Sequence, residues 1–321
     1  MSKGLPDIIG PKTYPFEPSG KNVEIDFIKE LGQGLHGVVW KVKIKDKIYA
    51  LKIFNWFRSL SCGGHASLGA DVLTDDEQDD YFQPFQNECR AYGRLKEFDC
   101  EELAYKCFGY IILQKEHFDF IKANYDNFET YEAQKTWSYL PDEEWYQEEP
   151  LRALVKEFVD IPYLEPLEEL ARTMNPGIAR KAVKNLKLIH QLGICQLDIN
   201  RSNYQHGKFL DFSCTMTAPH PWLSKKYGDD FPPLYEATSD AVALDITIED
   251  WNEFNPERKI WIACTRNNMY TARLRDRPRR NLEWSPQPAD FNYDKVRKMF
   301  NRKEKAALKR AKAKEDQNEK E

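Results

Sequence analysis

Two groups of residues, far apart in the chain, have the types and spacing needed for phosphate chemistry. The first is a glycine-rich run, LGQGLHGV over residues 31–38, with Gly32, Gly34 and Gly37. Glycine has no Cβ, so its backbone amides can approach phosphate oxygens closely. Alternating apolar residues flank the run and no helix pattern follows it. The run therefore predicts a hairpin turn and argues against a dinucleotide-binding fold.

Lys52 is placed to reach a phosphate bound at this turn. It follows Gly37 by fifteen residues, enough for one strand, a turn at 45–47 and a returning strand over 48–54. Its ammonium group would then lie under the glycine-rich turn and contact phosphate oxygens, provided that a carboxylate holds it in place. Taken alone, Lys52 also fits an exposed strand lysine, but the glycine-rich run beside it favours the functional interpretation.

A predicted helix supplies the carboxylate. Apolar residues at positions 85, 89, 92 and 95 have helical spacing. Glu88 lies within this stretch and is the first candidate partner for Lys52. Glu97, at the end of the same stretch, is the second candidate.

The second group consists of Asp198, Asn203 and Asp211, with a His206–Gly207 pair between them that suits a tight hairpin turn. Carboxylate and amide oxygens are the ligands that magnesium prefers. A carboxylate in such a loop can also orient and deprotonate a hydroxyl group. The alternative interpretation is a polar turn that begins at residue 198 and a strand end at residue 211.

Together the two groups resemble the ATP site of protein kinases. The resemblance implies an α+β, two-lobed protein-kinase-like fold, with a small β-rich amino-terminal lobe and a reduced helical carboxyl-terminal lobe. It implies ATP and magnesium as ligands. Asp198 would be the catalytic base, with Lys52 and Glu88 as the phosphate-binding pair. Asn203 and Asp211 would hold the metal. The nucleotide contacts that it implies are Gly32, Gly34, Gly37, Val38, Ala50, Lys52, Glu157 and Val159.

Several positions depart from the protein-kinase pattern. Gln196 and Leu197 stand where that family has His and Arg, so control by a phosphorylated activation segment is not expected. Asn200 replaces a lysine that contacts the transferring phosphate, which predicts low activity. Ser213 replaces the last glycine of the metal-binding motif. The main prediction is an ATP- and magnesium-dependent phosphotransferase, and a pseudokinase or nucleotide-gated scaffold is the first alternative.

A narrower resemblance concerns three stretches: 188–204, 210–214 and the Ala-Pro-His-Pro-Trp run over 218–222. They are similar to filamentous-fungal kinase-like proteins that are catalogued under the name of a fungal kinetochore subunit. This resemblance adds a second alternative, a kinetochore or chromatin interaction subunit with kinetochore or chromatin proteins as partners. The phosphate acceptor, a protein or a small molecule, is not identified by the sequence. Neither a nucleic-acid partner nor a membrane partner is expected.

Composition and spacing also define the expected organisation. The chain has 321 residues, a net charge of −5 and seven cysteines. No Cys-x-x-Cys pair is present, and no apolar run reaches the ~18 residues of a membrane span, so we expect a cytoplasmic or nuclear protein. The arginine-rich run over 266–280 is interpreted as a solvated face, with contact to an acidic partner as the alternative.

The expected divisions follow the positions of the motifs. They are an irregular leader over 1–20, a small lobe over 21–160 with insertions at 55–83 and 118–145, a reduced large lobe over 161–290, and a charged tail over 291–321. The further predicted elements are strands over 109–115 and 151–159 and a helix over 176–190.

Overall fold

A computed structural model describes residues 10–16, 23–34, 36–54, 80–124, 151–160, 176–199 and 203–220. The predictions for the first insertion after residue 54, for most of the second insertion, for Asn200, for the arginine-rich run and for the charged tail lie outside these residues. Within the described ranges, no helix is long and apolar enough to cross a membrane.

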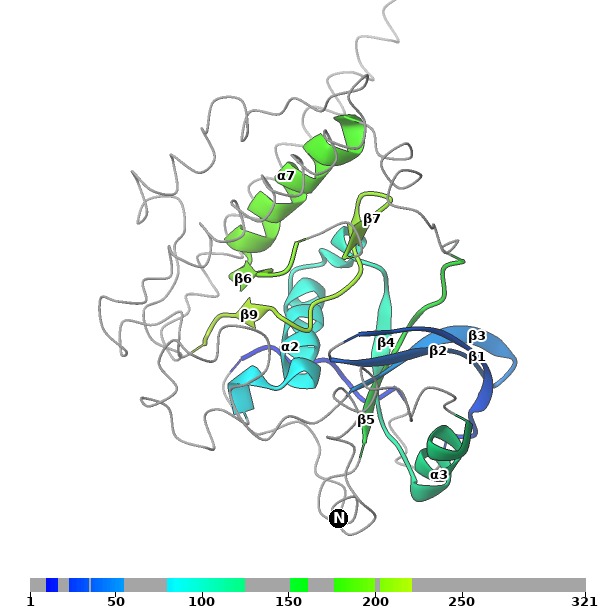
Figure 1. Cartoon of the computed structure of the whole chain (residues 1–321). Helices are drawn as coiled ribbons and strands as arrows, with labels where there is room; N and C mark the ends of the chain where they lie inside the picture. Colours follow the sequence, from blue (N-terminus) through cyan, green and yellow to red (C-terminus); the bar gives the residue numbers. More distant parts are fainter. Residues whose placement is uncertain are drawn as a thin grey trace, which may run out of the picture.

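Five antiparallel strands form the largest sheet, in the order β1, β2, β3, β5 and β4 (Figure 1). The strands are β1 Asp26–Gly34, β2 Gly37–Ile44, β3 Lys47–Phe54, β4 Cys107–Ile112 and β5 Arg152–Glu157, and a 3-10 turn, η2 Glu101–Leu103, precedes β4. The predicted strands over 48–54, 109–115 and 151–159 are confirmed, although the ends of β4 and β5 are shifted.

Local sequence accounts for the β2–β3 hairpin. Strand β2 alternates fully buried residues, such as Val38 and Val42, with more exposed ones. This is the period-two pattern of a strand with one face in a core. Lys45 and Asp46 form the turn with φ values of 48° and 65°. Positive φ at both central residues gives the twist that fits a tight hairpin, so the predicted hairpin is confirmed.

Helix α2 (Pro84–Glu97) lies beside the sheet (Figure 1). Every residue from its first turn to Leu95 is buried, so the helix is covered on all sides. Two of its arginines, Arg90 and Arg94, donate hydrogen bonds to the backbone carbonyls of residues 217–219. These bonds attach the helix to the segment that follows Asp211 in the chain.

The chain after the sheet forms a long helix and two small strand pairs. The elements are α7 Pro176–Gln191, β6 Ile194–Cys195, β7 Tyr204–Gln205, β8 Lys208–Phe209 and β9 Met216–Thr217. Strands β7 and β8 are joined by a turn at His206 and Gly207, with φ values of 49° and 78°. The predicted helix over 176–190 and the predicted tight turn are confirmed. Because β6 pairs with β9, the chain returns on itself and brings Asp198 and Asp211 to neighbouring loops.

Two apolar clusters hold these elements together. One lies between the sheet and helix α3 (Lys115–Asn124) and includes Leu51 and Ile121. The other forms where α2, α7 and the short strands meet, and it includes Phe54 from β3 and Leu186 from α7. The two faces of the sheet therefore contact different parts of the protein.

Residues 10–16, within the predicted irregular leader, lie along β4 at the edge of the sheet. The backbone N–H of Phe16 donates to the carbonyl of Tyr110 at 2.9 Å, and the N–H of Tyr110 donates to the carbonyl of Tyr14 at 3.0 Å. Gly109 has a φ of 133°, and a Cβ there would lie 2.5 Å from the Tyr14 oxygen. Only glycine permits this approach. This part of the leader covers an edge strand that would otherwise be unpaired on one side.

Candidate functional site

The strand register defines which residues share a face of the sheet with Lys52. Residues paired across antiparallel strands lie on the same face, as do residues two apart along one strand. Lys52 pairs with Val39, and Ala50 pairs with Lys156, so these four side chains share one face. Val38 lies on the opposite face and has no exposed surface. The register therefore replaces Val38 with Val39 as the β2 residue beside Lys52.

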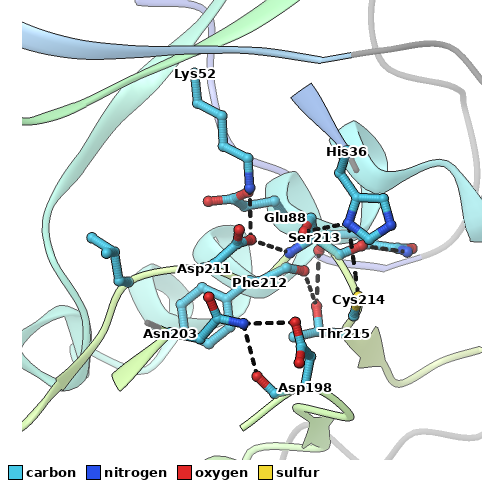
Figure 2. Close-up of polar contacts among 12 residues, drawn as sticks. His36, Lys52, Glu88, Asp198, Asn203, Asp211, Phe212, Ser213, Cys214 and Thr215 are labelled. Carbon is cyan, nitrogen blue, oxygen red and sulfur yellow. Dashed lines mark hydrogen bonds and ion pairs between the residues drawn. The ribbon is translucent and has the colours of Figure 1, made fainter. Parts of the chain in front are cut away.

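Lys52 joins three parts of the chain (Figure 2). Its Nζ lies 2.8 Å from Oε2 of Glu88 on α2 and 2.6 Å from Oδ1 of Asp211. The Glu88 side chain is fully buried and that of Lys52 is 7% exposed, so the pair is removed from water. Glu97, the second candidate partner, instead pairs with Arg94 at 3.1 Å. The fold thus brings the glycine-loop lysine, the helix carboxylate and the distant aspartate together.

Lys156, on β5, is a second ammonium group in the same cluster. Its Nζ lies 2.5 Å from Oε1 of Glu88 and 2.5 Å from the backbone oxygen of Leu210. Burial alone would lower the pKa of Lys156, but the charges of Glu88 and Asp211 raise it above its ordinary value. The two oxygens of the Glu88 carboxylate are therefore each paired with a different lysine.

Asp211 is held from several sides. Its Oδ1 accepts a hydrogen bond from the backbone N–H of Ser213 at 2.7 Å, and its backbone oxygen accepts one from Nε2 of Gln196 at 2.6 Å. Burial alone would raise the pKa of Asp211, but Lys52 and Lys156 lower it well below its ordinary value. The carboxylate is therefore ionised at neutral pH. Gln196, which departs from the protein-kinase pattern, connects the loop of Asp198 to the segment of Asp211.

Asp198 and Asn203 form a pair within their loop. Nδ2 of Asn203 donates to Oδ2 of Asp198 at 2.6 Å and to its backbone oxygen at 2.9 Å. Both partners are acceptors, so the amide nitrogen faces Asp198 and the amide oxygen faces away. Leu197 has a φ of 62°, which turns the backbone sharply just before Asp198. Figure 2 shows the pair on the side of Asp211 opposite Lys52.

The glycines of the first motif have different roles. Gly37 has a φ of 154°, and a Cβ at this position would lie 2.0 Å from the backbone oxygen of Ile53. Gly37 is therefore required for the close packing of β2 on β3. A Cβ at Gly32 or Gly34 would meet nothing within 4 Å. These two positions leave open space at the turn, which is compatible with the predicted approach of a ligand.

His36, inside the glycine-rich run, contacts the segment after Asp211. Its Nδ1 lies 2.8 Å from Oγ of Ser213 and 3.7 Å from Sγ of Cys214 (Figure 2). Burial and the nearby charge of Lys52 lower the pKa of His36 to about 4, so the imidazole is neutral at pH 7. The contact joins the tip of the glycine-rich turn to the loop that carries the site carboxylate.

The predicted adenine contacts lie at the end of β5. The backbone N–H of Glu157 donates to the carbonyl of Lys106 at 2.8 Å, and its Oε2 accepts from the N–H of Lys106 at 3.2 Å. These bonds tie the strand end to the residue that precedes β4. Val159 follows the strand and is half-buried. Both residues come directly after Lys156, which lies on the face of the ion cluster.

The residues expected to hold magnesium fit that ion by ligand type but not by charge. Asp211 and the outward oxygen of Asn203 are hard oxygen donors. The cluster around Asp211, however, already balances two carboxylates with two ammonium groups. It therefore lacks the excess negative charge that draws a divalent cation into a site. In the described part of the chain, no group of three or more histidine, cysteine, aspartate or glutamate side chains is arranged to hold a metal.

The described elements combine a five-stranded sheet with a small number of helices, and a charged site lies where the sheet, helix α2 and the loop of Asp211 meet. The family model described as kinetochore Sim4 complex subunit FTA2 matches residues 1–216, well over half of the 321-residue chain. The chain belongs to this family. The kinetochore-subunit resemblance seen in the sequence is therefore confirmed. No curated protein matches the chain.

Three residues of this site were missed or left unassigned by reasoning from the sequence. Val39 can be found by counting outward from the Lys45–Asp46 turn, which pairs it with Lys52. Lys156 has a visible signal, because a lysine directly follows the apolar run Ala153–Val155 within the strand. No local pattern predicts the contact of His36 with Ser213, because the two residues are 177 positions apart.

Proposed function

We propose that this protein is a subunit of a kinetochore complex, and that its core is a nucleotide-binding scaffold of protein-kinase-like fold. The observation that carries the kinetochore role is membership of the FTA2 family, whose description names the Sim4 complex. The matched range, residues 1–216, includes the sheet, α2, α7 and the charged site. A kinetochore role places the protein in the nucleus, with kinetochore proteins as its partners.

The order of the described elements supports a protein-kinase-like fold. A glycine-rich hairpin is followed by a strand lysine, Lys52, and then by a helix whose carboxylate, Glu88, pairs with it. Further along come a loop with Asp198 and Asn203, a short hairpin and then Asp211. The same order of groups occurs in protein kinases.

The charged cluster supports a scaffold that binds ATP. Lys52 occupies the position of the strand lysine that contacts phosphate oxygens in the nucleotide site of protein kinases. Lys52 and Lys156 join β3, β5 and α2 through Glu88, and Lys52 also contacts the Asp211 loop. A nucleotide held by Lys52 would therefore bind where these elements meet.

Phosphotransfer is the second candidate function, and the Asp198–Asn203 contact favours it. Asn203 fixes one oxygen of the Asp198 carboxylate, as a base that must meet an acceptor hydroxyl requires. The acceptor would be a protein or a small molecule. This candidate predicts that Asp198→Asn abolishes transfer of the ATP γ-phosphate while leaving ATP binding intact, because the phosphate-binding lysine is unchanged. Equal transfer by the variant and the native protein would refute it.

Localisation tests the kinetochore role directly. The protein, tagged at its own locus, should form foci that coincide with centromeric nucleosomes and should co-purify with other subunits of the complex. Diffuse fluorescence without such foci would refute the role. In the same cells, Lys52→Ala should impair chromosome segregation if nucleotide binding supports the scaffold, whereas Asp198→Asn should not. If neither substitution affects chromosome segregation, the remaining interpretation is an interaction subunit whose nucleotide site has no role.

A further inference from the structure

Four charged side chains form one closed cluster at the proposed nucleotide site. Nζ of Lys52 contacts both Glu88 and Asp211, at 2.8 Å and 2.6 Å, and Nζ of Lys156 contacts Glu88 at 2.5 Å. The side chains of Glu88, Lys52 and Lys156 are 0%, 7% and 6% exposed. The side chain of Asp211 is 29% exposed. Two positive and two negative charges therefore balance each other, and three of the four are removed from water.

Lys156 changes the charge of this cluster by one unit. Without it, Lys52 would face two carboxylates, and the three groups would carry a net charge of −1. A buried net negative charge attracts a cation and repels the phosphates of a nucleotide. With Lys156 present, the net charge is zero, and the negative charge of Asp211 is offset without any ion from solution.

The position of Lys156 is fixed by the fold. Its backbone pairs with Ala50 of β3, and its Nζ is held by Glu88 and by the backbone oxygen of Leu210. The raised pKa of Lys156 keeps the ammonium group charged at neutral pH. Lys156 is therefore a permanent, immobile positive charge at the site.

The second lysine also changes what Lys52 can do. Because Lys156 pairs with Oε1 of Glu88, Lys52 can turn toward a phosphate without leaving that carboxylate bare. The movement would still separate Lys52 from Asp211. In a cluster with a single lysine it would also leave the buried Glu88 carboxylate without any partner, which is costly.

We propose that Lys156 supplies the positive charge that a divalent cation would otherwise bring, so that the site binds a nucleoside triphosphate without metal. This inference rests on the proposed nucleotide-binding function. Lys156 acts through Glu88 and Asp211 and is a positioning residue. The expected ligand is the free triphosphate, with Lys52 in contact with its phosphate oxygens.

Thermal shift and calorimetry with the full chain test this inference. ATP is the probe, in EDTA or in magnesium, with the native protein, Lys156→Met and Lys156→Arg. The native protein should bind ATP in EDTA about as tightly as in magnesium. Lys156→Met, which keeps most of the unbranched side chain but removes the charge, should lose about tenfold or more of its affinity in EDTA and recover it in magnesium. Lys156→Arg should behave like the native protein.

The outcomes separate this inference from the function on which it rests. If the native protein binds ATP only with magnesium, the nucleotide site stands and the role of Lys156 is refuted. Equal affinities of Lys156→Met and the native protein in EDTA would also refute that role. If the native protein binds ATP under neither condition, both proposals fail. If Lys156→Met does not fold, the affinities of the native protein for ATP in EDTA and in magnesium still decide whether binding requires the metal.

Discussion

The two faces of the central sheet are both buried, but they are built in opposite ways. The buried cluster on the face toward α3 is apolar and includes Leu51, Ile53 and Ile121. The face toward α2 carries two lysines, Lys52 and Lys156, paired with carboxylates. An apolar face gains stability from surface removed from water, whereas a charged face is stable only while every charge keeps its partner.

This difference bears on the proposed nucleotide site. Buried ion pairs are rarely the most stabilising way to fill a core, and apolar residues of similar volume often do as well or better. Two lysines on one face, paired with the buried Glu88 and the partly exposed Asp211, therefore indicate a role other than stability. We infer that the α3 face holds the sheet together, and that the α2 face is kept charged for binding.

The largest expected effect comes from breaking the charged face at its centre. Glu88→Gln leaves two lysines with one neutral side chain, whose amide group can accept from only one of them. We expect a loss of about 3–5 kcal/mol in the free energy of unfolding, measured by urea denaturation. Glu97→Gln, on the exposed end of the same helix, should change it by no more than about 0.5 kcal/mol. A Glu88→Gln variant as stable as the native protein would show that the cluster is not held by charge.

A cavity on the apolar face should have the next largest effect. Leu51→Ala, next to Lys52 on β3, removes a fully buried side chain and should cost about 2–5 kcal/mol. Because it lies on the opposite face, ATP binding by the folded variant should remain within about threefold of the native value, since ΔΔG values at separated groups largely add. Loss of ATP binding in a folded variant would mean that the two faces are coupled.

Removing one lysine should cost less. Lys156→Met fills the same space with an apolar chain, and Glu88 keeps Lys52 as a partner. We expect a change of about 1 kcal/mol or less in the free energy of unfolding. Lys52→Met is the matched control and should cost more, because both Glu88 and Asp211 then lose a direct partner. If the order of the two variants is reversed, Lys156 is the principal partner of Glu88.

Acid should lower the free energy of unfolding through His36, which contacts Ser213. Its folded-state pKa, about 4, is below its ordinary value of 6.5. The unfolded chain therefore takes up the proton first. The stability contributed by neutral His36 is complete above pH 6.5 and is lost progressively as the pH falls to about 4. His36→Asn keeps a polar group near the Nδ1 position but does not titrate in this range.

The melting temperature should therefore fall less steeply between pH 6.5 and 4 in His36→Asn than in the native protein. Other groups that titrate in this range, including His220, are common to both proteins, so the difference isolates His36. If the melting temperatures of the two proteins fall in parallel as the pH is lowered, His36 makes no contribution to the pH dependence of stability.

Much of the fold is visible in the sequence because it depends on local pattern. The β2–β3 hairpin follows from alternation and a two-residue turn, and α2 and α7 follow from helical spacing. Glu88 was a candidate for the same reason, since it lies in an amphipathic stretch. Val38 was predicted as a nucleotide contact from the motif alone, without the strand pairing. A shift of one residue along a strand moves a side chain to the opposite face of the sheet.

The chain by itself therefore determined the hairpin and the helices, and it gave the set of residues that are predicted to bind phosphate. Tertiary structure decided how those residues are paired. Lys156 meets Glu88 across 68 positions, and His36 meets Ser213 across 177. Such contacts depend on which elements pack together, so they cannot be predicted from the periodicity of the sequence. The charge balance at Asp211 is for this reason a property of the fold. Two lysines from different strands converge on the buried carboxylate of Glu88, and their charges lower the pKa of Asp211.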